Sequence, residues 1–81
     1  MGDMSLFAAK SQLDVKAEEA RMRDNLSYYG LDELRQDVCV LKFIYNLNML
    51  DIAELLHIPS TGTAQYLLSS AIKRLREQGY E

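Results

Sequence analysis

Apolar residues recur at helical spacing through the last third of the chain. Between residues 61 and 78 they form one stripe, and the opposite face carries short polar side chains. Ile52, Leu55 and Leu56 give a shorter segment before it a similar buried face, and Pro59 prevents that segment from continuing as a helix. The pattern predicts two helices joined by a tight turn. The predicted stripe of the second helix consists of Ala64, Leu68, Ala71 and Leu75, broadened by Leu67 and Ile72.

A more apolar helix is predicted upstream. Gly30 is suited to a turn, and Asp32 to the N-cap of the helix that follows. Asn46 and Asn48 mark its expected end. Because apolar residues surround most of this helix, we expect a central element packed on more than one side. These residues are Leu34, Val38, Leu41 and Tyr45 on one face, with Val40, Phe43, Ile44 and Leu47 beside it.

An N-terminal helix is predicted from about residue 5 to 26, where strong helix formers occur without glycine or proline. Its apolar stripe is poor, because three of its five members are alanines: Leu6, Ala9, Leu13, Ala17 and Ala20. Such a stripe is suited either to resting on the core or to meeting a second subunit. The expected fold is all-α, with an N-terminal helix in residues 1–29 as an oligomerisation or packing arm, and a three-helix domain in residues 30–81.

Composition narrows the class of protein further. At 81 residues, 48% of them hydrophobic and only one a proline, the chain predicts a single small folded domain. Neither a membrane-length apolar run nor a secretion signal is evident, so we expect a cytoplasmic protein with no membrane partner. Cys39 is the only cysteine and His57 the only histidine, so we expect no metal, cofactor or disulfide. Such a thin core favours self-association as a dimer.

Charge is distributed unevenly along the chain. The formal net charge is −3, which argues against a protein that coats nucleic acid without regard to sequence. Residues 60–81 alone lean positive, with Lys73, Arg74 and Arg76 against two glutamates.

Nothing indicates an enzyme, since no glycine-rich phosphate loop or paired nucleophile and base is present.

The segment of residues 51–77 resembles the helix-turn-helix of bacterial sigma factor region 4. It carries Asp51-Ile-Ala-Glu-Leu-Leu-His-Ile-Pro-Ser-Thr-Gly-Thr-Ala and ends in Ile72-Lys-Arg-Leu-Arg-Glu. The close, Leu75-Arg-Glu-Gln-Gly-Tyr, is also similar to winged-helix repressors, although we expect no wing here. The resemblance covers about residues 49–79 and implies a second helix that enters the DNA major groove.

The resemblance implies two sets of contacts. The candidates for reading base edges are Thr63, Gln65, Tyr66 and Ser69, among which glutamine can pair with adenine through two hydrogen bonds. The candidates for gripping phosphates, which set the register on DNA, are Ser60, Thr61, Ser70, Lys73, Arg74 and Arg76.

This chain departs from the family pattern at three points. His57 stands where the family has glycine, so a left-handed backbone there would be strained. The turn at residues 59–61 is one residue longer than the common form. The middle of the second helix also lacks the usual lysines and arginines, so a monomer would bind DNA weakly and a dimer is expected.

Two functions follow from these features. The first is a small transcriptional regulator, bacterial or phage in style, that binds double-stranded DNA as a homodimer through the helix at about residues 61–78. The alternative is a protein-binding adaptor on the same scaffold, which contacts RNA polymerase, a sigma factor or another regulator. Tyr28, Tyr29 and Tyr66, expected on the surface, favour the adaptor, because tyrosine is enriched at interfaces.

Overall fold

Residues 12–79 are described by a computed structural model, which is all-helical over this range. In chain order the helices are α2 (Gln12–Tyr28), α3 (Glu33–Phe43), α4 (Met49–Leu55) and α5 (Thr61–Glu77). The expected all-α fold is therefore confirmed. No helix in this range is long and apolar enough to span a membrane.

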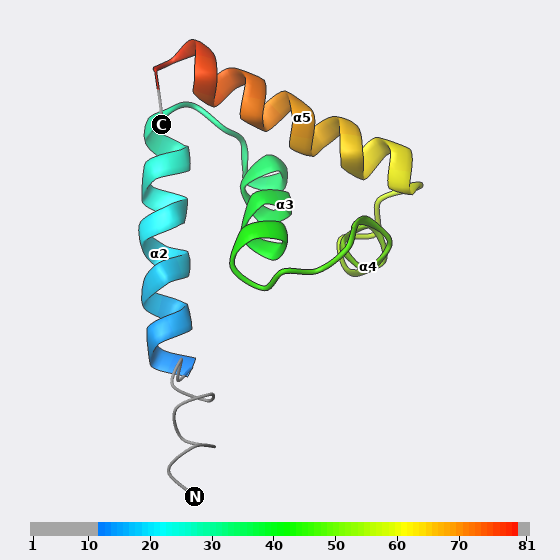
Figure 1. Cartoon of the computed structure of the whole chain (residues 1–81), viewed down its shortest axis with the longest axis horizontal. Helices are drawn as coiled ribbons and strands as arrows, with labels where there is room; N and C mark the ends of the chain where they lie inside the picture. Colours follow the sequence, from blue (N-terminus) through cyan, green and yellow to red (C-terminus); the bar gives the residue numbers. More distant parts are fainter. Residues whose placement is uncertain (1–11, 80–81) are drawn as a thin grey trace, which may run out of the picture.

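Helix α3 lies at the centre of the molecule, between α2 on one side and α4 and α5 on the other (Figure 1). The C-terminal end of α5 lies near the turn between α2 and α3, and its N-terminal half lies near α4. Val38, Cys39 and Val40 of α3 are each at most 1% exposed. Burial raises the pKa of the Cys39 thiol to about 11, so the thiol stays protonated at neutral pH.

The predicted stripe of α5 is confirmed. Ala64, Leu67, Leu68, Ala71 and Leu75 are buried, and Ile72 is partly buried against the same core. Burial of this apolar area against α3 and α4 is the main stabilising contribution on this side of the molecule.

Three expectations about the core were wrong. Helix α3 ends at Phe43, before the predicted asparagines, and Asn46 follows in a left-handed conformation with φ 60°. Leu34 and Phe43, at opposite ends of α3, and Tyr45, just after it, are exposed rather than buried, because the neighbouring helices do not cover these positions. Leu55 is 58% exposed, because the seven-residue α4 turns Ile52 and Ala53 toward the core instead.

The contact face of α2 also differs from the prediction. Ala17 and Ala20 are exposed, whereas Leu26 is buried and Met22 packs partly buried against the same core. Leu6, Ala9 and the side chain of Leu13 lie outside the described residues. The described part of α2 therefore packs on α3 of its own chain through a different helix face from the expected one.

Candidate nucleic-acid interface

The turn after α4 is closed by backbone hydrogen bonds. The Ile58 N–H donates to the Ala53 carbonyl at 2.8 Å, and the His57 N–H donates to the Glu54 carbonyl at 3.3 Å. This pair of bonds is a Schellman motif, whose left-handed position is usually glycine. His57 occupies that position with φ 57°, which is the strained conformation expected from the sequence. Ile58 then packs against the core and anchors the turn.

Helix α5 begins with a side-chain cap. Ser60 has an extended backbone, and its hydroxyl accepts a hydrogen bond from the Thr63 N–H at 3.1 Å. The Thr63 hydroxyl lies 3.1 Å from the same Ser60 oxygen. Ser60 is therefore the N-cap of α5. Both hydroxyls therefore already take part in hydrogen bonds at the start of the helix.

The predicted base-contact residues divide into two groups. Gln65, Tyr66 and Ser69 are exposed, and none of their side chains bonds to another described residue. Tyr66 is 64% exposed, so its ring stands free on the surface of α5. Thr63 is also exposed, but its hydroxyl already faces the cap serine.

The predicted phosphate-contact residues fall at two ends of α5. Ser60 and Thr61 stand at its start and Arg76 near its finish, about 24 Å farther along the axis at 1.5 Å per residue. A single phosphate cannot touch both ends. Lys73 and Arg76 are exposed and bond to no other described residue, so both ammonium and guanidinium groups are available to a ligand.

Ser70 and Arg74 lie on the flank of α5 that faces α3 and the turn before it. The Ser70 hydroxyl accepts a hydrogen bond from Arg35 Nε at 2.9 Å, and Arg74 Nε donates to the Tyr29 carbonyl at 3.3 Å. These two side chains already have partners inside the protein. In this they differ from Lys73 and Arg76, whose side chains have no partner among the described residues.

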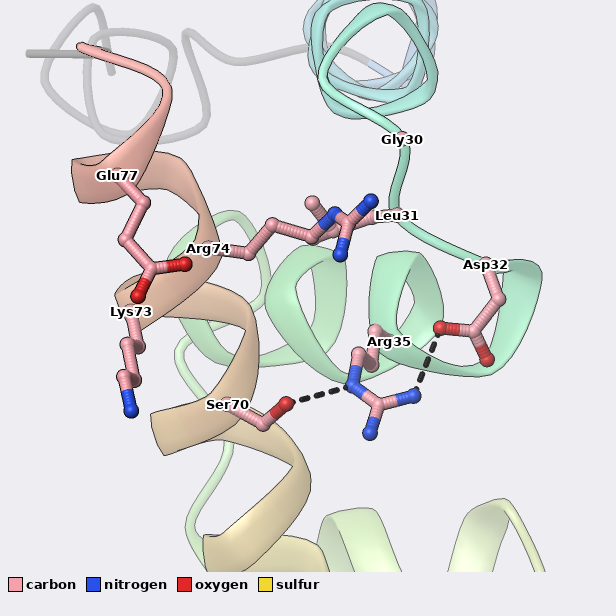
Figure 2. Close-up of a pocket in the computed structure, with 8 residues that line it drawn as sticks. All are labelled: Gly30, Leu31, Asp32, Arg35, Ser70, Lys73, Arg74 and Glu77. Atoms are coloured by element: carbon pink, nitrogen blue, oxygen red, sulfur yellow. Dashed lines mark hydrogen bonds and ion pairs between the residues drawn. The ribbon is translucent and has the colours of Figure 1, made fainter.

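Arg35 is a site residue that the sequence did not reveal. It lies in α3, 35 positions before Ser70, and brings another cation beside the C-terminal half of α5 (Figure 2). Its Nη1 also donates to Asp32 Oδ1 at 2.9 Å. This hydrogen bond from Arg35 lowers the pKa of Asp32, which keeps the carboxyl ionised at neutral pH. No periodicity in the chain links Arg35 to α5.

Gly30 makes room for Arg74. The glycine ends α2 with φ +87°, and a Cβ there would lie 3.1 Å from Arg74 Nη2. The Gly30 and Leu31 amides complete a second Schellman motif, in which they donate to Ser27 and Leu26. The predicted turn at Gly30 is confirmed, and the lack of a side chain there also lets the guanidinium lie against the turn.

The charges around α5 are polarised along the helix. Residues 61–72 carry no charged side chain, and the adjacent α4 carries the exposed Asp51 and Glu54. The cations gather at the other end, where α5 contributes three and α3 contributes Arg35. Within residues 12–79 no cluster of histidine, cysteine or carboxylate groups could hold a metal ion.

No protein-family model, no curated protein and no solved structure matched this chain. The similarity to sigma factor region 4 therefore remains a prediction from the quoted residues.

Proposed function

We propose that this chain is a helix-turn-helix DNA-binding regulator that lays the outward face of α5 in the major groove. The observation that carries this proposal is the exposed row of Gln65, Tyr66 and Ser69, without partners among the described residues, on a helix capped by Ser60. Hydrogen-bonding side chains of this size reach base edges when a helix lies in the groove.

The cations set the strength of the proposed complex. Lys73 and Arg76 would contact backbone phosphates, which fix the register of the helix without reading sequence. So few phosphate contacts give a weak electrostatic contribution for one chain at physiological salt. The protein would therefore act as a homodimer, in which two α5 helices read half-sites one helical turn apart.

The test is fluorescence anisotropy of labelled duplexes over a range of salt concentrations. Lys73→Ala and Arg76→Ala should each weaken binding to all sequences alike and reduce the salt slope by about one. Gln65→Ala should instead change the preferred base at one position, at a cost of about 1–3 kcal/mol for the best site. Arg21→Ala, on the exposed surface of α2, is the matched control and should leave both quantities unchanged.

A second candidate function is an adaptor that docks on a transcription protein such as RNA polymerase. The observation that favours it is a set of exposed apolar side chains on α3 and α4, in which Phe43, Leu50 and Leu55 are each at least 55% exposed. Tyr28 and Tyr66 are exposed as this alternative expects, whereas Tyr29 is half-buried and packs edge-on against Tyr28. Absence of duplex binding at low salt would reject DNA recognition and leave the adaptor.

A further inference from the structure

A cleft of about 500 Å³ opens between the C-terminal half of α5, the N-terminus of α3 and the turn that joins α2 to α3 (Figure 2). Two arginine side chains reach into it, Arg35 from α3 and Arg74 from α5. Lys73 and Glu77 complete its α5 side, and Asp32 lies across from them. A cleft of this size accommodates a small ligand or part of a larger one.

Both guanidinium groups are held in place and keep donors to spare. Arg35 uses Nε on Ser70 and Nη1 on Asp32, which leaves three of its five N–H groups unassigned. Arg74 uses Nε on the Tyr29 carbonyl, which leaves its four terminal N–H groups. A planar guanidinium with free terminal donors matches the oxygens of a phosphate group.

The charge around the cleft favours an anion. Three cations face two carboxylates, and one of these, Asp32, is already paired with Arg35. The N-terminus of α3, where Asp32 is the N-cap, borders the cleft and adds the partial positive charge of its dipole. Glu77 is therefore the one carboxylate of the cleft without a cation partner among the described residues.

We propose that this cleft binds a phosphate group, with Arg35 and Arg74 as its guanidinium ligands and Lys73 as a third positive charge. The favoured source is a backbone phosphate of duplex DNA, because the cleft lies beside the same α5 that carries the exposed polar row. For that source the inference rests on the proposed function. A free phosphate ester is the other source of the same chemistry.

The first test is an NMR titration with inorganic phosphate, against sodium chloride at equal ionic strength. Saturable shifts are expected at the Hε signals of Arg35 and Arg74 and at the Gly30 and Leu31 amides. Arg35→Gln and Arg74→Gln should each weaken phosphate binding about fivefold or more, the size of one lost ion pair. Arg21→Gln, which removes the same charge from the exposed surface of α2, should change it less than about twofold.

A variant that binds phosphate more tightly distinguishes a binding role of the arginines from a purely structural one. Glu77→Gln removes the unpaired carboxylate and should tighten phosphate binding about two- to threefold. Glu54→Gln makes the same change in net charge on α4 and should have no effect on this affinity. Ser70→Ala releases the Arg35 contact to α5 but keeps the charge, so phosphate should still saturate in a folded variant.

Repeating the titration with a short DNA duplex distinguishes a backbone phosphate of DNA from a free phosphate ester as the ligand. Phosphate saturation together with a smaller salt slope for duplex binding in Arg35→Gln supports a DNA phosphate in the cleft. Phosphate saturation without duplex binding keeps the cleft, as a site for a free ester, and rejects the proposed function. A third outcome is that the duplex binds, no phosphate shift saturates and Arg35→Gln leaves duplex binding unchanged. This result would show that the cleft does not bind phosphate, and it would not contradict the proposed function.

Discussion

The two sides of α3 are held to their neighbours by different forces. On the side of α4 and α5 the contacts are apolar, built from fully buried residues such as Ile52, Ala64 and Ala71. On the side of α2, Leu26 is buried and Met22 partly buried near its C-terminal end, and polar contacts lie beside them: Arg23 pairs with Asp37 at 2.8 Å and Tyr45 bonds to Glu19 at 3.0 Å. Half-exposed ion pairs contribute little free energy, whereas buried apolar side chains contribute much. Helices α3, α4 and α5 therefore form the more stable unit, and α2 is attached to it more weakly.

The largest expected effect comes from breaking the apolar side. Ile52→Ala should lower the free energy of unfolding by about 3 kcal/mol, because a fully buried isoleucine leaves a cavity between α4 and its neighbours. Urea denaturation followed by circular dichroism measures this loss. Leu55→Ala, on the same helix but exposed, should change stability by less than about 0.5 kcal/mol. Equal losses in the two variants would contradict the packing described for α4.

The next largest loss of stability is expected at Gly30, in the turn that joins α2 to α3. Gly30→Ala forces a Cβ into a left-handed turn and against Arg74, and should cost about 1–2 kcal/mol. Gly79→Ala is the matched control, because its φ is +85° but nothing lies within 4 Å of the added Cβ. A larger loss at Gly30 than at Gly79, measured by the same denaturation, would show that the contact with Arg74 matters beyond backbone strain.

A smaller effect of opposite sign is expected at the turn between α4 and α5. His57→Gly should stabilise the protein by about 0.5–1 kcal/mol, because glycine adopts φ 57° without strain. Asn46→Gly, at φ 60°, should gain less, since asparagine tolerates the left-handed region better than histidine. A loss of thermal stability in His57→Gly would indicate that the imidazole makes a favourable contribution that outweighs its strain.

The smallest effect is the response of the α2 side to acid. Hydrogen bonds from Arg23 and then from Tyr45 lower the pKa of Glu19. A carboxyl with a lowered folded pKa contributes stability above its unfolded pKa of about 4.3, and this contribution is lost as pH falls through the folded value. Hydrogen exchange of α2 amides should therefore accelerate below about pH 4 relative to those of α5. Glu19→Gln should reduce this difference, and Glu54→Gln should not.

Local patterns in the chain predicted much of the fold and part of the candidate site. The stripe of α5, the turn at Gly30 and the strained backbone at His57 follow from preferences within a few residues. The same patterns placed Gln65, Tyr66 and Ser69 on the exposed face. They failed where apolar residues surround a helix, as at Phe43 and Leu55, because periodicity alone does not say which side the neighbours cover.

By itself, then, the sequence determined the approximate positions of the helices, which face of α5 is buried and that a left-handed turn follows α2 at Gly30. These properties depend on neighbours one to four positions away along the chain. Only the tertiary structure decided that Arg35 meets Ser70, that Arg74 lies over Gly30 and that α2 attaches through Arg23 and Asp37. Those contacts join residues far apart in the sequence, and they exist only because the buried apolar faces bring α2, α3 and α5 together.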